Sequence, residues 1–500
     1  MSLVLVVDVG TTNIKAGVVD PEGSLLSQAS RNLEVHRPEK GAAEHDPDEL
    51  LDALYEMVRA ATDGYEAEID LLGLTGYQHG FLPLDAEGEP LTGMITLMDE
   101  RPKGVMGELQ NREDLAEIYR RTGCPPLFTY QLPKLIWFQK EKPELYARSR
   151  YFADIKSFLT RKLTGDFVTE PGIASSSQLF NINDLDWDDY LLDLAGINRN
   201  QLPDIGSGED LMNGLRPGPA EKMNLGQDLS VNLGVYDGGA MVLGLGGVAS
   251  GHGVCNLGTT AMLRTYSDRP VLDDPERRRL QTYSLFPGKW AIGGAINNAG
   301  VGLRWFRDNF QPEKSYEDLI AGATAVSPGS DGVFSLPFFT GERDPRIGNM
   351  ASGSFFGLKE YHDREHMVRS LLEGVGYSLN LVREAMTENG IEFDRIRIGG
   401  SGASSDLWPQ IISDVTELPV EKTLTEDTTL IGEAMLAYKT MGIYDSLSEA
   451  SSEMVKSGKK FTPVREEIEI YREGYGFFKK LVNEFHGLYP LHDENFSPGS

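Results

Sequence analysis

The sequence Asp8-Val9-Gly10-Thr11-Thr12-Asn13-Ile14-Lys15 returns, nearly unchanged, as Asn256-Leu257-Gly258-Thr259-Thr260 half a chain later. Apolar, β-branched runs at residues 3–7 and 14–19 flank the first copy and predict a strand pair joined by a tight turn. Gly10 is the expected turn residue, since glycine adopts a positive φ without a Cβ penalty. Such a turn presents backbone N–H groups and threonine hydroxyls, and both can donate hydrogen bonds to phosphate oxygens. One copy alone would more simply be an ordinary hairpin, but two copies predict paired phosphate-binding hairpins on two similar domains.

The length of the chain predicts more than one domain. A chain of 500 residues is too long to fold around one hydrophobic core, because domains usually contain roughly 100–250 residues. A composition with 40% apolar residues, 55 Gly and 26 Pro is typical of a globular α/β chain with many loops. The second hairpin lies near the midpoint, so we expect an N-terminal domain over residues 1–247, a C-terminal domain over 248–480 and a polar tail over 481–500.

Charge and hydropathy exclude several classes of function. A formal net charge of −29 makes nucleic acid and anionic membranes poor partners. No apolar run approaches the ~18 residues of a membrane span, and the chain begins with a strand rather than a signal peptide. We therefore expect a cytoplasmic protein. Its two cysteines, Cys124 and Cys255, stand far apart and indicate neither a disulfide framework nor a zinc site.

Two further segments carry candidate site residues. The apolar run 69–74 predicts a buried strand that ends in Thr75-Gly76-Tyr77-Gln78-His79-Gly80, and ligands of open α/β sheets bind at such strand ends. By itself, a histidine in this position is more often structural. Asp237 stands between glycines, before a run of small and apolar residues that predicts a helix. It is either a helix N-cap or an acid that approaches a ligand closely.

A glycine-rich turn follows a third predicted strand. Residues 396–398 run into Gly399-Gly400-Ser401-Gly402-Ala403-Ser404, and a helix is expected through residue 415. A turn of this kind lets a nucleotide lie against the backbone, with amide donors near its phosphates. It is not a Walker loop, because no Gly-Lys-Ser/Thr follows, and alone it is not diagnostic.

Together these motifs resemble the FGGY family of carbohydrate kinases over almost the whole chain. The matching residues, in order, are Asp8-x-Gly-Thr-Thr-x-x-Lys15, Gly76-x-x-His79-Gly80, Asp99-x-Arg101, Asp237, Gly258-Thr259-Thr260, Gly341-Glu342-Arg343-x-Pro345 and Gly399-Gly400. The resemblance implies an α/β fold of two ribonuclease-H-like (actin-like ATPase) domains that face each other across a cleft. It further implies ATP and Mg²⁺ as cofactors, with ATP mainly on the C-terminal domain and a sugar mainly on the N-terminal one.

The resemblance assigns a role to each matching position. Asp237 resembles the general base, Asp8 the carboxylate that holds Mg²⁺, and Lys15 the cation beside the γ-phosphate. Gln78 and His79 resemble the sugar-contact pair, next to Asp237. The positions similar to nucleotide contacts are Gly10, Thr11, Thr12, Gly258, Thr259, Thr260, Gly300, Arg304, Gly399, Gly400 and Ser404. In the second hairpin Asn256 replaces the acid, which leaves one metal carboxylate, and Asp99 with Arg101 is expected to be a supporting ion pair.

The substrate is less sharply indicated than the reaction. Residues 173–188 and 294–298 are most similar to gluconate kinases, whereas His79-Gly80 is more similar to xylulose kinases. Four positions depart from residues that are common in the family. Leu97 replaces a tryptophan and Arg304 replaces a glutamine. Tyr77 stands in place of a usual glutamine, and Gly238 in place of a polar residue. We expect a sugar acid or ketose, with gluconate slightly favoured and a ketopentose next.

Two alternatives stay open at this point. One is an actin-like or chaperone-like ATPase acting on a protein partner, which would need neither the Gln78-His79 loop nor Asp237. The other is a sugar-binding regulator without catalysis, which the presence of Asp8, Lys15 and Asp237 disfavours. Dimers are common in the family, although the residues themselves do not indicate a homodimer.

Overall fold

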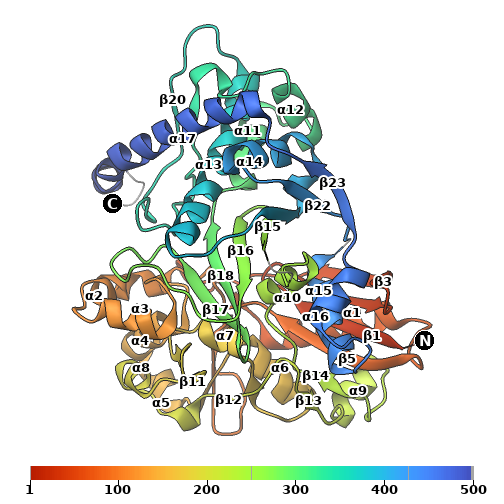
Figure 1. Ribbon diagram of the computed structural model, residues 1–500. Coiled ribbons are helices and arrows are strands. Elements are labelled where there is room, and N and C mark those ends of the chain that lie inside the picture. Colours follow the sequence, from red (N-terminus) through yellow and green to blue (C-terminus); the bar gives the residue numbers. More distant parts are fainter. Residues whose placement is uncertain (1, 249–250, 426, 497–500) are drawn as a thin grey trace.

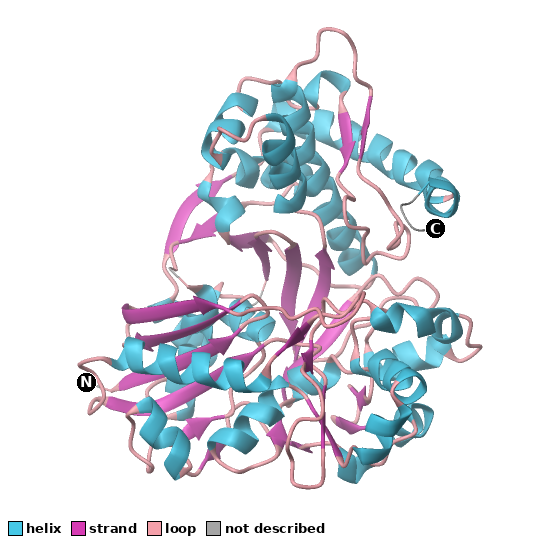
Figure 2. Ribbon diagram, turned by 180° about the vertical axis from the view of Figure 1, so that it is seen from behind, coloured by secondary structure: helices cyan, strands magenta, loops and turns pink. Residues whose placement is uncertain are grey.

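The computed structural model describes residues 2–248, 251–425 and 427–496. Figure 1 shows two lobes: the lower contains the N-terminal half, in red to yellow, and the upper contains most of the C-terminal half. Each lobe is built on one large mixed sheet, and Figure 2 shows the two sheets one above the other with helices packed along them. The predicted α/β class is confirmed.

The first sheet contains the first hairpin. Its strands, from edge to edge, are β13 (Leu211–Met212), β14 (Val231–Asn232), β5 (Ile69–Gly76), β1 (Leu3–Val9), β2 (Asn13–Val19) and β3 (Leu25–Asn32). All of β1 is buried, as its nearly unbroken apolar run requires for a strand covered on both faces. β1 is antiparallel to β2 and parallel to β5, so Asp8 lies opposite Lys15 on one side and Thr75 on the other. The predicted strand pair is confirmed.

The second sheet repeats this order. Its strands are β17 (Gln281–Phe286), β18 (Lys289–Ile296), β16 (Ala261–Ser267), β15 (His252–Leu257), β21 (Arg395–Gly399), β22 (Val420–Thr423) and β23 (Ser457–Phe461). β15 is antiparallel to β16 and parallel to β21, as β1 is to β2 and β5. Asn256 lies opposite Met262 and Gly399, which is the register of Asp8 in the first sheet. The two copies of the motif therefore occupy equivalent places in two similar sheets.

Helices and short strand pairs complete both lobes. The helices are α1 (Pro47–Thr62), α2 (Met106–Gln110), α3 (Leu115–Thr122), α4 (Gln131–Glu141), α5 (Pro143–Arg148), α6 (Ile155–Leu163), α7 (Pro171–Ser175), α8 (Asp189–Ala195), α9 (Pro217–Met223), α10 (Asp237–Gly244), α11 (Gly300–Phe310), α12 (Tyr316–Ala323), α13 (Arg364–Glu388), α14 (Leu407–Thr416), α15 (Thr428–Thr440), α16 (Leu447–Met454), α17 (Arg465–His486) and α18 (Leu488–Phe496). The short strand pairs are β4 (Glu44–His45) with β7 (Met94–Ile95), β6 (Leu82–Leu84) with β8 (Tyr151–Ala153), β9 (Val168–Thr169) with β12 (Asp204–Ile205), β10 (Phe180–Asn181) with β11 (Asp186–Trp187) and β19 (Phe334–Leu336) with β20 (Ser354–Phe356).

Helices α15 and α16 return from the C-terminal half to the first sheet. In Figure 1 these blue helices lie beside β1, β5 and α10 in the lower lobe. Their buried side chains, among them Leu430, Met435 and Tyr438, belong to the same hydrophobic core as the residues of β1 and β5. Residues 428–455 of the expected C-terminal segment thus complete the core of the N-terminal lobe. Because the chain then returns to the second sheet at β23, this excursion adds two further covalent connections between the lobes.

The crossing of α10 and α15 depends on two glycines. A Cβ on Gly432 would lie 1.7 Å from the carbonyl oxygen of Ala240, and a Cβ on Gly244 would lie 1.8 Å from that of Thr428. Contacts this short are impossible for real atoms, so the helix backbones approach as closely as they do only because neither position has a side chain. α10 begins at Asp237, so this crossing fixes the helix that carries the candidate base.

Gly432→Ala is expected to destabilise the protein by about 1–3 kcal/mol or more, because the two helices must move apart. The measurement is the thermal unfolding midpoint relative to the unsubstituted chain. Gly476→Ala on α17 is the matched control: its added methyl group meets no atom within 4 Å, and alanine favours a helix interior by about 1 kcal/mol over glycine. A midpoint for Gly432→Ala equal to that of the control would contradict the close crossing.

The expected polar tail is largely helical where it is described. α17 ends at His486 and α18 spans Leu488–Phe496, while residues 497–500 lie outside the described part. Over the ranges that the structure describes, no helix combines the length and the apolar character that a membrane crossing requires.

Candidate active site

A glycine N–H closes the turn of each repeated hairpin, and the first turn is one residue longer than the second. In the first, the Gly10 N–H donates to the Asn13 carbonyl at 3.0 Å; in the second, the Gly258 N–H donates to the Thr260 carbonyl at 2.9 Å. Thr12, Thr259 and Thr260 are exposed at the tips. Their hydroxyls are therefore accessible, as the predicted phosphate contacts require.

Asp8 is a buried carboxylate at the end of the first strand of the hairpin. Burial raises its pKa to about 7, and the charge of Asp237 adds to this effect. Among the described side chains, Asp8 Oδ1 is a buried polar atom without a hydrogen-bond partner. An unsatisfied carboxylate oxygen is a hard ligand of the kind Mg²⁺ prefers, so the site fits the predicted metal.

Asp237 is the first residue of α10, and the N-cap position belongs to Tyr236. The N-cap interpretation of Asp237 is therefore not supported. Its Oδ1 accepts a hydrogen bond from the Gly238 N–H at 2.7 Å. Burial raises the pKa of Asp237 to about 6, while this hydrogen bond and the charges of Lys156 and Arg264 oppose the shift. A carboxyl group with this pKa is ionised at pH 7, and its pKa is close enough to 7 for it to accept a proton during the reaction.

Lys15 is held by an acid that sequence analysis missed. Its Nζ donates to Asp427 Oδ2 at 2.7 Å, and Asp427 also caps α15 by accepting from the N–H groups of Thr429 and Leu430. An aspartate before an apolar helical run is an N-cap signal, so the cap could have been predicted. The pairing with Lys15, four hundred residues away, could not.

Five predicted nucleotide contacts line one cavity of about 350 Å³. They are Gly258, Thr259, Gly300, Arg304 and Ser404. Leu303, Tyr316, Ile320 and Trp408 add an apolar wall that was not predicted. Such a combination of small polar groups and apolar side chains suits a nucleotide.

The remaining predicted nucleotide contacts lie outside that lining. Gly10, Thr11 and Thr12 are on the hairpin of the other sheet. Thr260 belongs to the turn of the second hairpin, and Gly399 and Gly400 lie beside that hairpin, but none of the three lines the cavity. Gly400 has a φ of +90°, and a Cβ there would lie 2.6 Å from the Leu257 carbonyl oxygen. Only glycine therefore lets the turn after β21 lie directly against the hairpin.

Gln78 and His79 follow β5 and are both fixed to the α7 segment. Gln78 Nε2 donates to the Gly172 carbonyl at 3.0 Å, and His79 Nδ1 lies 3.2 Å from the Ser176 carbonyl. Burial lowers the pKa of His79 to about 3, so the ring is neutral. Its Nε2 has no protein partner among the described residues and remains available for a substrate hydroxyl.

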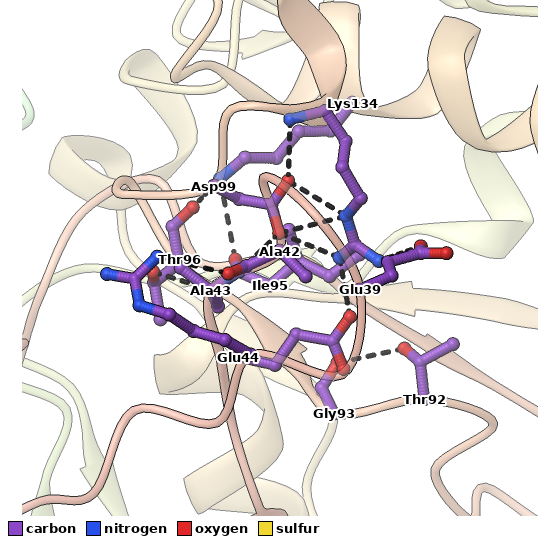
Figure 3. Close-up of polar contacts among 12 residues, drawn as sticks. Glu39, Ala42, Ala43, Glu44, Thr92, Gly93, Ile95, Thr96, Asp99 and Lys134 are labelled. Atoms are coloured by element: carbon purple, nitrogen blue, oxygen red, sulfur yellow. Dashed lines mark hydrogen bonds and ion pairs between the residues drawn. The ribbon is translucent and has the colours of Figure 1, made fainter.

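A buried lysine on α4 holds this loop in place. Lys134 Nζ donates to the carbonyls of His79 at 2.5 Å and Thr96 at 2.8 Å. Figure 3 shows Lys134 next to Asp99, whose carboxylate accepts from Arg101 Nη2 at 2.7 Å. The expected Asp99–Arg101 ion pair is thus confirmed. Lys134 was missed because a lysine in an amphipathic helix is normally exposed.

A second buried lysine connects the sugar loop to the base. Lys156 Nζ donates to the carbonyls of Leu74 and Leu233, both at 2.6 Å, and of Val235 at 3.1 Å. These carbonyls belong to the end of β5 and to the segment before Asp237. Glu433 on α15 accepts from the Val235 N–H at 3.1 Å. The segment that carries the candidate base is therefore fixed from two sides.

Between the lobes lies a cavity of about 560 Å³. Leu97, Pro126 and Phe128 line it from the N-terminal half, and Asn297 and Arg343 from the C-terminal half. Leu97 thus stands in the wall of the cleft, as its place in the motif predicts.

Comparisons with known proteins agree with this arrangement. The N-terminal domain of the FGGY family of carbohydrate kinases matches residues 3–244, and its C-terminal domain matches residues 253–441. A gluconokinase of Bacillus subtilis is 31% identical over 94% of either chain, and a xylulose kinase of the same organism is 26% identical over 96% of this chain and 97% of its own.

Solved structures show the same fold. A gluconate kinase from Lactobacillus acidophilus superposes with a TM-score of 0.94 at 26% identity, covering 98% of this chain and 99% of its own. A ligand-bound xylulose kinase from the same organism gives 0.93 at 26% identity, with the same coverage. These neighbours confirm the two-domain, actin-like ATPase fold. Because both family domains match in order, on the two lobes that carry the repeated hairpins, the chain belongs to the FGGY family of carbohydrate kinases.

Proposed function

We propose that this carbohydrate kinase transfers the γ-phosphoryl group of ATP to a hydroxyl of an open-chain sugar acid of the gluconate type. The observation that carries the proposal is the position of Asp237, a buried acid that begins a fixed helix and whose charge contributes to the raised pKa of Asp8. A ketopentose such as xylulose is the second candidate.

Asp237 is the proposed general base. It accepts the proton of the attacking hydroxyl, and its carboxylate form, present above pH 6 or so, is the one that can do this. Lys156 and Glu433 hold the preceding backbone, so the carboxylate has little freedom to turn away. In phosphoryl transfer the protein acts mostly by positioning and charge neutralisation, which agrees with such fixed geometry.

Asp8 is the proposed ligand of Mg²⁺, through its unpartnered Oδ1. When bound, the ion neutralises charge on the phosphate oxygens. Lys15 and the two hairpin turns supply the protein donors around the phosphates, and the cavity between Gly300 and Trp408 accommodates the rest of the nucleotide. Lys15 then exchanges some of its interaction with Asp427 for the phosphate.

The relatives support gluconate over xylulose by a small margin. The gluconokinase of Bacillus subtilis is 31% identical, against 26% for the xylulose kinase, but gluconate and xylulose kinase structures superpose almost equally well. An ATPase that acts on a protein partner loses its support, because both family matches are to carbohydrate kinases. The cytoplasmic location and a homodimer stay predictions.

A substrate panel tests the proposed function. ADP release should depend on added sugar, with the highest kcat/KM for gluconate, lower values for xylulose and ribulose, and none above background for glycerol. The measurement is a coupled ADP assay with each compound in turn. ADP release that is equally fast without any sugar would contradict the proposal, and a clear preference for a ketopentose would replace gluconate by the second candidate.

A further inference from the structure

Arg264 is a buried arginine without an acidic partner. It lies on β16, directly after the second hairpin, and is 5% exposed. Its Nη2 donates to Gln281 Oε1 at 3.0 Å, whereas Nη1 is buried and has no partner among the described residues. A buried donor of a charged group is costly to leave unsatisfied.

Two other buried arginine side chains among the described residues are neutralised. Arg369 donates to Glu373 Oε1 at 2.9 Å, and Arg279 pairs with Asp273 at 2.8 Å. No carboxylate oxygen of the described residues lies within 4 Å of the Arg264 guanidinium. Charged side chains are almost never fully buried unless they are paired, so this exception indicates a partner that is not part of the protein.

Ring contacts connect Arg264 to the residues around the candidate base and the sugar-contact histidine. Its guanidinium carbon lies 4.8 Å from the centroid of the Tyr283 ring. Tyr283 packs edge-on against Tyr236, the neighbour of Asp237, with centroids 6.2 Å apart. On its other side the Tyr283 hydroxyl lies 3.0 Å from that of Tyr130, whose ring is 5.1 Å from His79. Arg264 thus joins a set of aromatic contacts that connects Tyr236, next to the candidate base, with the sugar-contact histidine.

The charge of Arg264 acts on both of these groups. It opposes the rise in the pKa of Asp237 and contributes to the low pKa of His79. The other charge that acts on Asp237 comes from Lys156, and those on His79 come from Lys134 and Arg343. The charges that shift the pKa values of these two groups are therefore all cationic, in a chain with a net charge of −29.

We propose that Arg264 binds the carboxylate of the substrate through Nη1, and that this contact selects sugar acids over neutral ketoses. The inference rests on the proposed function, because it takes the space around Asp237 and His79 as the sugar site. A carboxylate supplies the missing charge and hydrogen-bond acceptor together, and arginine pairs with it strongly. A neutral ketose leaves the buried guanidinium without its anion.

The test compares gluconate with gluconamide, which replaces the carboxylate by a neutral amide of similar shape. Arg264→Met should raise the KM for gluconate by roughly 100-fold, the usual size of the loss when one partner of a buried charge pair is removed. The kcat/KM for gluconamide should change by no more than a few-fold. Arg264→Lys, which keeps the charge, should recover part of the preference for gluconate.

Two outcomes separate this role from others. Equal losses for gluconate and gluconamide in Arg264→Met would show a structural role and overturn the proposal. A selective loss in Arg343→Met but not in Arg264→Met would assign the carboxylate to the other arginine of the cleft and also overturn it.

A different measurement applies if the proposed function itself is wrong. If no sugar of the panel were turned over, calorimetric titration of gluconate into the unsubstituted protein and Arg264→Met would still test the contact. Weaker binding to the variant by roughly 100-fold supports the proposal, and equal binding overturns it. A preference of the unsubstituted kinase for xylulose over gluconate would overturn the inference while leaving the kinase activity intact.

Discussion

Asp237→Asn is expected to lower kcat by about 10²–10⁴-fold with every sugar, because it removes the proposed proton acceptor and changes little else. The amide has the shape of the carboxylate and can still accept from the Gly238 N–H, which lies 2.7 Å from Oδ1 in the structure. The KM for ATP should remain within a few-fold, since none of the groups lining the nucleotide cavity is altered. The measurement is steady-state ADP release with gluconate and ATP varied in turn.

The pH profile gives an independent check on the same residue. Burial raises the pKa of Asp237 to about 6, so the fraction of carboxylate falls as the pH drops through that value. kcat should therefore decline tenfold per pH unit on the acid side of pH 6 and level off above it. The residual activity of Asp237→Asn should lack this limb. A variant with undiminished kcat, or one that keeps the acid limb, would remove Asp237 from the role of base.

The fold was predictable because its signals are local. A buried β-branched run, a glycine turn and a second run define each hairpin, and the copy around Gly258 indicates a second sheet of the same kind. The N-cap at Asp46 and the helix after Gly400 also follow from neighbouring residues. The family resemblance then implied two similar α/β domains, which agrees with the two large mixed sheets.

The parts of the site that were missed depend on distant contacts. Lys134 and Lys156 resemble surface lysines in sequence, yet each is buried and donates to backbone carbonyls from other elements. Asp427 acts on Lys15 only because α15 returns to the first sheet. In the sequence, Arg264 is one polar residue within a predicted strand. That its Nη1 has no partner can be recognised only when all of its neighbours in space are known. Local sequence patterns therefore predict the reacting groups, but not the residues that position them.

Asp8→Asn is expected to raise the Mg²⁺ concentration needed for half-maximal activity by at least about tenfold, since second-shell changes alone weaken metal sites by about 10–100-fold. An amide oxygen still ligates weakly, so high Mg²⁺ should restore part of the activity, which it cannot do for Asp237→Asn. Burial opposes the charged form of Asp8, and the neutral amide should therefore not lower the thermal unfolding midpoint.

The matched control for Asp8→Asn is Asp20→Asn. Asp20 is likewise buried and directly follows β2, at the end of the hairpin remote from its turn, where its Oδ1 accepts from the Ser24 N–H at 2.7 Å. Its replacement should leave the Mg²⁺ dependence of ADP release unchanged. If Asp8→Asn showed the same Mg²⁺ titration as the control, the unpartnered Oδ1 of Asp8 would not be the metal ligand. The repeated hairpins would then differ in sequence, with Asp8 in the first and Asn256 in the second, without differing in metal binding. The two sheets contribute unequally to phosphate binding only if the Mg²⁺ titration of Asp8→Asn is shifted.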